Sequence, residues 1–272
     1  MLFPMAQAVR YSFYKWNGLG PLDNFVGFDN YREVLDNDLF RQAVQHNLAI
    51  VVLSIVVQLP LGLGIALLLN RDIKFRGLLR TIIFVPYVLA EVVAGVIWQL
   101  MLQPDGPLDV VLQKVGLGSF TNEWLGNPDI VLYTLMGVLT WKYLGFAILL
   151  FLAGLQGVPQ ELHEAAAIDG ASWWQIQRRI TIPLLGPTIR TWIFLSMIGS
   201  LQLFDMVKIL MGADGNGPAN STVTMATFLV SQGFKRSRYG YGSAAAVVLL
   251  VISLTMALIY QRLVLRRDNR DD

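Results

Sequence analysis

Two ionisable residues, Glu91 and Lys142, lie inside long apolar stretches of the sequence. An ionisable side chain at the centre of a membrane helix costs at least about 3 kcal/mol on insertion scales, so it usually faces a partner or a water-filled cavity. If consecutive stretches form antiparallel helices, the carboxylate and the ammonium lie at similar depth and can pair. Three alternatives stay open: each residue lines a solute path by itself, pairs with a second chain, or serves an intramembrane enzyme.

Two further polar residues, Gln202 and Asp205, lie in the outer half of a later apolar stretch. Their side chains are candidates for hydrogen bonds to the hydroxyl groups of a transported solute. Lys208 follows Asp205 by three residues, so an ion pair on one helix face is an equally good interpretation.

The remaining residues with chemical potential do not indicate metal or thiol chemistry. His46 and His163 are the only histidines, and neither has companions at metal-ligand spacing. The chain has no cysteine, which excludes disulfides and a cysteine nucleophile. Asn47 begins an apolar stretch, where exposure at the membrane interface is favoured over a role in lining a path. We therefore predict no metal site.

The elements that position these residues are apolar blocks of about 20 or more residues, the length at which a helix crosses roughly 30 Å of hydrocarbon. The chain is 54% hydrophobic and 15% charged, whereas an average soluble domain has about 25% charged residues. No block alternates like a barrel strand. The net charge of +2 is too small to indicate a nucleic-acid partner. We predict an all-α polytopic membrane protein with five full spans, at residues 43–69, 80–102, 130–153, 188–211 and 241–262.

Basic residues in the connections predict the orientation of these spans. The span ends at one side of the membrane carry eleven lysines and arginines, and those at the other side carry seven. The side with eleven comprises the connections Arg71–Arg80, Arg178–Arg190 and Arg262–Arg270. We expect this set, and with it the tail at residues 263–272, to be cytoplasmic. Residues 1–16 then form the outer end of a truncated first span in a complete protein of six transmembrane helices. Residues 17–42 form an external loop.

A cytoplasmic connection within residues 154–187 is too structured to be a plain linker. Pro159 fits the first turn of a helix, and Gly170 is placed to end that helix in the left-handed conformation. Two short helices joined at Gly170 are expected. Ala165 and Ala166 leave one face almost without side-chain bulk, and Glu164 adds a charge beside it. This pattern predicts a surface on which another protein docks closely.

The same residues resemble a known signature: Glu164-Ala165-Ala166, then Gly170, then Ile180-Thr181-Ile182-Pro183. It is similar to the cytoplasmic loop of binding-protein-dependent ABC importer permeases, except that Ile182 stands where that family usually has leucine. Further matches lie at Phe28–Tyr31, Gly77–Thr81, Trp141–Lys142, Phe151–Leu155, Gly199–Ser200, Phe204–Asp205 and residues 215–218. The chain resembles the carbohydrate subfamily of maltose and oligosaccharide permeases, and its glycine-rich external turn resembles the first of the two permease types paired there.

The resemblance implies a type-1 ABC importer transmembrane domain over residues 43–262, paired with a second homologous permease. It also implies two ATPase subunits, an extracytoplasmic solute-binding protein, a sugar substrate, and the plasma membrane of a bacterium or archaeon. ATP and Mg belong to the separate ATPase, because no lysine here is followed by serine or threonine and the phosphate-cradling loop is absent. The chain itself is expected to hold no cofactor and to be no enzyme.

The expected site residues fall into two groups. The ATPase-docking loop comprises Glu164, Ala165, Ala166, Gly170, Ile180 and Pro183, and the translocation-path candidates are Glu91, Lys142, Gln202 and Asp205. By resemblance, closure of the two ATPases around nucleotide moves the two permeases from inward-open to outward-open. An ABC permease for a non-sugar solute and an intramembrane enzyme are the alternatives.

Overall fold

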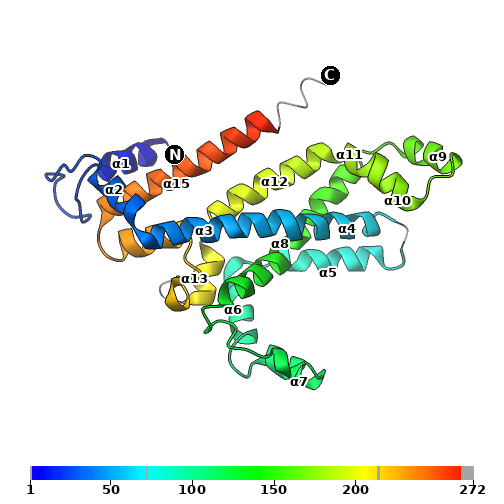
Figure 1. Cartoon of the computed structure of the whole chain (residues 1–272), viewed down its shortest axis with the longest axis horizontal. Helices are drawn as coiled ribbons and strands as arrows, with labels where there is room; N and C mark the ends of the chain where they lie inside the picture. Colours follow the sequence, from blue (N-terminus) through cyan, green and yellow to red (C-terminus); the bar gives the residue numbers. More distant parts are fainter. Residues whose placement is uncertain (1, 72, 213–214, 265–272) are drawn as a thin grey trace.

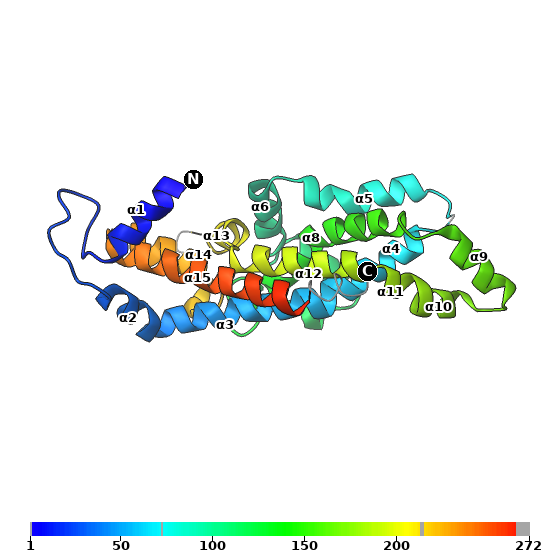
Figure 2. The same cartoon turned by 90° about the horizontal axis from the view of Figure 1, so that it is seen from above.

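The computed structural model describes residues 2–71, 73–212 and 215–264. They form an elongated helical bundle in which the only strand-like feature within those ranges is an isolated bridge between Tyr14 and Phe25. Helices α1 (Leu2–Ser12) and α2 (Asp29–Asp36) lie at one end of the long axis, and α9 (Gln160–Ile168) and α10 (Trp173–Ile176) lie at the other (Figures 1 and 2). The predicted all-α class is confirmed.

Three helices are long and apolar enough to cross a membrane: Asp38–Leu69, α8 (Val131–Leu155) and α15 (Tyr239–Leu263). In α15 the candidate span is Tyr239–Arg262. The first consists of α3 (Asp38–Leu53), a π-helix (Ser54–Gln58) and α4 (Leu59–Leu69). They correspond to the predicted spans at 43–69, 130–153 and 241–262, which are confirmed as long apolar helices. Gly62 lets α4 approach α8, because a Cβ there would lie 2.9 Å from the Cβ of Ala147.

The other two predicted spans are wrong as single helices. Residues 80–102 form α5 (Arg76–Val88) and α6 (Glu91–Met101), which meet at an angle of 96°. Leu89 and Ala90 between them have extended backbone, with ψ of 140° and 144°. Residues 188–211 divide into α12 (Gly186–Leu201) and α13 (Asp205–Met211). Apolar composition indicates burial in lipid or protein, and it does not reveal an interruption whose carbonyls are satisfied by distant side chains.

Two π-helices each stand just before a proline. The π-helix Ser54–Gln58 is followed by Pro60, and a second, Gln177–Thr181, is followed by Pro183 in α11 (Ile182–Leu184). A proline inside a helix has no N–H for the carbonyl four residues back, and its ring clashes with that carbonyl. A wider preceding turn relieves this conflict, because its last hydrogen bond spans five residues, as from Leu59 N to Ser54 O.

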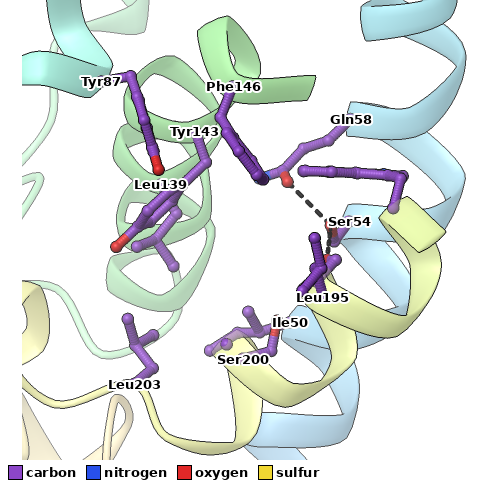
Figure 3. A pocket seen from close by; sticks show the side chains of 13 residues that line it. Ile50, Ser54, Gln58, Tyr87, Leu139, Tyr143, Phe146, Leu195, Ser200 and Leu203 are labelled. Atoms are coloured by element: carbon purple, nitrogen blue, oxygen red, sulfur yellow. Dashed lines mark hydrogen bonds between the residues drawn. The ribbon is translucent and has the colours of Figure 1, made fainter. Parts of the chain in front are cut away.

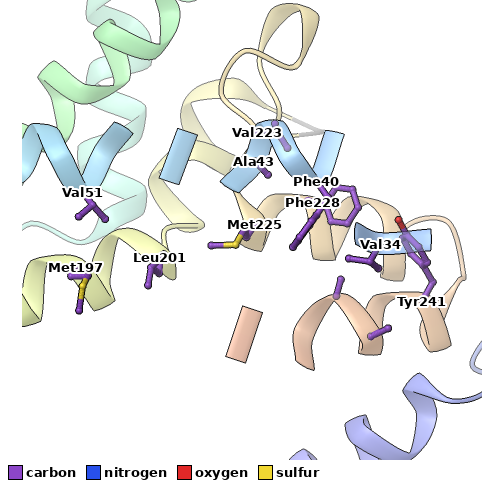
Figure 4. Packing of buried hydrophobic residues seen from close by; sticks show 12 residues of the cluster. Val34, Phe40, Ala43, Val51, Met197, Leu201, Val223, Met225, Phe228 and Tyr241 are labelled. Carbon is purple, nitrogen blue, oxygen red and sulfur yellow. The ribbon is translucent and has the colours of Figure 1, made fainter. Parts of the chain in front are cut away.

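The shorter elements lie mainly in the connections between the long helices. They are α7 (Pro107–Lys114), α14 (Met225–Phe228), a third π-helix (Leu229–Phe234), and 3₁₀ turns at Gly118–Phe120 and Pro218–Asn220. Figure 4 shows how α14 is fixed: Phe228 packs on Phe40 of α3 with ring centroids 5.3 Å apart, beside Tyr241 of α15. This apolar cluster holds α3, α12, α14 and α15 together near the α1 end of the bundle.

Candidate functional site

Lys142 of α8 is buried, with only 2% of its side chain exposed, at the break between α5 and α6. Its Nζ donates to the carbonyls of Pro86 and Tyr87, both at 3.1 Å, and to that of Leu89. An ammonium has three N–H donors and no acceptor, so these three carbonyls use all of them. The lysine thus supplies the donors that α5 would have found in a next helical turn. A positive charge at a helix C-terminus is also stabilised by the helix dipole.

Glu91, the first residue of α6, lies next to this lysine. Its Oε1 is 3.8 Å from Lys142 Nζ and accepts a hydrogen bond of 3.0 Å from the hydroxyl of Tyr143. The structure therefore brings together the two charges that the sequence placed at similar depth. Because the donors of Lys142 are committed to carbonyls, the attraction of Glu91 is electrostatic. This arrangement leaves the ammonium no free N–H for acid catalysis by an intramembrane enzyme.

A cavity of about 180 Å³ lies beside this break, at the middle of the 32-residue helix Asp38–Leu69. It is bounded by α3 and the π-helix Ser54–Gln58 on one side, α5 and α8 on another, and α12 on a third (Figure 3). None of its thirteen lining residues is charged: they are Ile50, Ser54, Gln58, Tyr87, Leu139, Tyr143, Phe146, Trp192, Leu195, Ser196, Gly199, Ser200 and Leu203. The predicted path candidates flank this cavity at the helix breaks, and their neighbours Tyr143 and Leu203 line it.

One wall of the cavity is polar. The hydroxyl of Ser54 donates to Gln58 Oε1 at 2.8 Å and is hydrogen-bonded to the hydroxyl of Ser196. Gln58 Nε2 reaches the hydroxyl of Thr140 at 3.4 Å. Ser54 and Gln58 belong to the π-helix that precedes Pro60, so the widened turn presents both side chains to the cavity.

The opposite wall is aromatic (Figure 3). Tyr87 of α5 stacks on Phe146 of α8, with centroids 5.0 Å apart and ring planes 21° apart. It also meets Tyr143 edge-on at 6.5 Å, and Phe146 lies 6.0 Å from Trp192 of α12. The four rings therefore follow one another from Tyr143 through Tyr87 and Phe146 to Trp192, which lies one helical turn from Ser196 on α12.

The break after α12 is closed by a different side chain. Asn47 of α3 is fully buried, its Nδ2 donates to Ser200 O at 2.6 Å, and its Oδ1 accepts from Met225 N at 2.8 Å. Thr224 Oγ1 donates to Leu203 O at 2.8 Å. The sequence interpretation favoured exposure of Asn47 at the membrane interface, and that exposure is wrong because the side chain is fully buried. An amide at the polar start of a span gives no indication that it faces inward.

Gln202 and Asp205 lie at this second break, where both side chains are exposed. Lys208, the other member of the suggested ion pair, donates to the carbonyl of Gly212 at 3.2 Å. The roles of Gln202 and Asp205 in a path remain predictions.

Replacing Asn47 by alanine should lower the stability of the chain by about 1–3 kcal/mol, because it leaves Met225 N buried without its acceptor and takes the side-chain donor away from Ser200 O. Thermal unfolding in detergent measures the effect. Gln45, exposed two residues earlier on α3, gives the control variant Gln45→Ala. Equal midpoints for the two variants would contradict the assigned role of Asn47.

The loop at the α9 end has the predicted form. Helix α9 ends at Ile168, and Gly170 has φ of +77°. Gly170 N donates to Ala167 O at 3.0 Å and Ala171 N to Ala166 O at 2.9 Å, the two bonds of a Schellman C-cap. Glu164 and Ala165 are exposed on α9.

This loop is tied back to the bundle through its π-helix. His163 Nε2 lies 3.0 Å from the hydroxyl of Thr181, which is fully buried. Ile180 beside it is half-buried, and Pro183 is exposed. A side-chain hydrogen bond therefore links α9 to the turn that leads into α12.

The family whose description is "binding-protein-dependent transport system inner membrane component" matches residues 58–269. The chain belongs to this family. It is therefore a multi-pass membrane permease component of an ABC importer that receives its solute from a binding protein.

Relatives and solved structures agree with this membership. The permease is 34% identical over 260 residues to a probable ABC transporter permease protein, PH1215, of Pyrococcus horikoshii, covering 95% of this chain and 88% of that protein. It is 34% identical over 270 residues to the diacetylchitobiose uptake system permease protein NgcF of Streptomyces coelicolor, covering 95% and 76%. A chain of a bacterial ABC transporter involved in import of the acidic polysaccharide alginate shares the fold, with a TM-score of 0.85 at 23% identity over 98% of this permease and 90% of that chain.

Proposed function

We propose that this permease conducts an uncharged sugar or oligosaccharide through the cavity between α3, α5, α8 and α12. The observation that carries the proposal is the pairing of a four-ring aromatic wall with a wall of hydroxyl and amide groups, without a charged lining residue. A sugar ring has an apolar face of C–H groups and a rim of hydroxyls, so it matches both walls. Ligand sites commonly combine apolar lining with a few placed polar groups.

The similarity to sugar permeases supports a carbohydrate substrate. The relative NgcF is named for uptake of diacetylchitobiose, and the loop and turn motifs of this chain resemble the carbohydrate subfamily. Glu91 and Lys142 lie behind the aromatic wall, where their opposite charges balance and leave the cavity neutral. An acidic or basic solute would meet no opposite charge among the lining residues.

The proposed assembly contains a second, similar permease, two ATPases and the binding protein. Helix α5 has no buried residue, and its apolar residues Leu78, Ile82 and Val88 are exposed, which suits a face covered by the second permease. The loop Glu164–Pro183 is proposed to dock on the ATPase, which would put the α9 end in the cytoplasm together with the C-terminal end of α15. The α1 end would then meet the binding protein.

Filling the cavity from Gly199 tests the proposed function. A Cβ on Gly199 would meet no atom within 4 Å, and this residue lines the cavity. Gly199→Leu should lower ATP-dependent uptake of radiolabelled diacetylchitobiose or maltose by about tenfold or more, because the leucine side chain fills space that the sugar needs and a barrier raised by about 1.4 kcal/mol slows passage tenfold. The assay uses proteoliposomes that hold the complete transporter, with the loaded binding protein.

The matched control is Gly64→Leu. Gly64 is also a helical glycine with open space around its Cβ, but it lies on α4 away from the cavity. Normal uptake by Gly199→Leu in a normally assembled complex would overturn the proposed path. A wild-type complex that moves none of the neutral sugars would favour the non-sugar alternative.

A further inference from the structure

Tyr143 differs from the other three rings of the aromatic wall in how its polar end is held. Its ring lines the cavity, while its hydroxyl points away to Glu91 Oε1 at 3.0 Å (Figure 3 shows the ring beside Tyr87 and Leu139). A tyrosine ring turns about two side-chain bonds, and its hydroxyl oxygen lies on the axis of the second. A hydrogen bond at this far end therefore fixes the direction in which the ring extends from the backbone. The position of the Tyr143 ring in the cavity is therefore determined by Glu91, a residue that does not line the cavity.

Glu91 is itself fixed, which makes it an effective anchor. It begins α6, where the helix dipole favours a negative charge, and its Oε1 lies 3.8 Å from the buried ammonium of Lys142. Lys142 cannot follow a moving carboxylate, because its three donors hold the carbonyls of Pro86, Tyr87 and Leu89. The ammonium and the helix dipole thus both favour this position of the carboxylate.

Glu91 also depends on Tyr143 for its hydrogen bond. Within the described part of the chain, Glu91 Oε2 is buried and has no hydrogen-bond partner, so the Tyr143 hydroxyl is the donor on which the carboxylate relies. Tyr143 also contacts Tyr87, which stacks on Phe146. A shift of the Tyr143 ring therefore alters the shape of the wall beyond one residue.

We propose that Glu91 is a positioning residue for transport: held by Lys142, it fixes the Tyr143 ring and thereby sets which sugars the cavity accepts, without touching the sugar. This proposal rests on the sugar path proposed above. It deepens that function by assigning specificity to a charge outside the cavity lining.

The test uses the complete transporter with Glu91→Met, Tyr143→Phe and the double variant. Glu91→Met removes the carboxylate and keeps a side chain of similar size. Tyr143→Phe keeps the ring and removes the hydroxyl that donates to Glu91. Each single change should raise the KM for uptake of one sugar of a panel (diacetylchitobiose, maltose, cellobiose, trehalose) by about threefold to tenfold, the size of one hydrogen bond. The ratios of kcat/KM among the sugars should change as well. The double variant should be no worse than either single variant.

A merely structural role would instead reduce assembled transporter and kcat equally for every sugar. Additive effects in the double variant would overturn the proposal, because they would mean that the hydroxyl contacts sugar directly. Unchanged KM values and ratios in both single variants would also overturn it. Tyr133→Phe is the matched control, since Tyr133 lies on the same helix, is 71% exposed and does not line the cavity.

A second measurement decides the proposal even if the wild type transports none of these sugars, an outcome that would count against the sugar path alone. The chain has no cysteine of its own, so Gly199→Cys places a single thiol in the cavity. Glu91→Met should speed its labelling by a small charged methanethiosulfonate by about threefold or more, because the released ring uncovers the thiol. Equal labelling rates with and without the anchor would sink the proposal, and Tyr133→Phe should leave the rate unchanged.

Discussion

Replacing Lys142 by methionine is expected to destabilise the folded permease by about 3–5 kcal/mol, the cost of removing one partner from a buried charged contact. The carbonyls of Pro86, Tyr87 and Leu89 lose their donor, and Glu91 loses its balancing charge. The unfolding midpoint in detergent should fall by roughly 6–20 °C, at about 2–4 °C per kcal/mol. Lys114→Met, at an exposed position of α7, serves as control. A midpoint equal to that of the control would show that other groups satisfy these carbonyls.

Exchanging the two charges should not rescue this loss. A carboxylate at position 142 would face the oxygens of Pro86, Tyr87 and Leu89, which repel it. A lysine at position 91 would place positive charge at the N-terminus of α6, against the helix dipole. Failure of the exchange therefore does not argue against the contact between Glu91 and Lys142. Restoration of the wild-type midpoint would mean that the two side chains interact with little else.

The second large effect is expected at Gly170. Gly170→Val forces a β-branched residue into a left-handed conformation, at a cost of about 1–2 kcal/mol, and adds bulk beside the small face of α9. If this face docks on the ATPase, ATP hydrolysis stimulated by the loaded binding protein should fall by about tenfold or more. Co-purification of the ATPase with the permease measures docking directly.

Gly116 offers a matched control for backbone strain. It has φ of +82° and ends α7 with the same cap, through Gly116 N to Gln113 O at 3.1 Å and Leu117 N to Leu112 O at 2.8 Å. Gly116→Val should cost similar stability and leave stimulated hydrolysis intact. Equal loss of coupling in both variants would remove the case for docking at Gly170.

The sequence predicted local features well where one residue type determines the backbone. Gly170 ends α9 because glycine alone adopts that conformation freely, and continuous apolar length predicted α8 and α15. The breaks at Leu89–Ala90 and after Leu201 escaped prediction. Each depends on a side chain from another helix, Lys142 in one case and Asn47 in the other. A hydropathy value depends only on the residues of the segment itself, so it contains no information about a partner side chain on another helix.

The sequence predicted residues that flank the cavity, but it did not predict the residues that line it. The charges of Glu91 and Lys142 drew attention to the correct region because charge is rare in lipid. Ser54, Gln58 and Tyr143, which line the cavity, are individually ordinary residues in apolar segments. Gln58 could have indicated a polar site, because it places an amide in the middle of a span, four residues after Ser54 and two before Pro60.

The widened turn at Ser54–Gln58 also changes how this span must be read. A π-turn holds one residue more than an α-turn, so the angular phase of the helix shifts by about one residue, roughly 100°. A helical wheel drawn without interruption from Asp38 to Leu69 therefore assigns α4 to the wrong faces. The same holds beyond Thr181. Comparisons of lipid-facing and cavity-facing positions among related permeases need to restart their count at Leu59 and at Ile182.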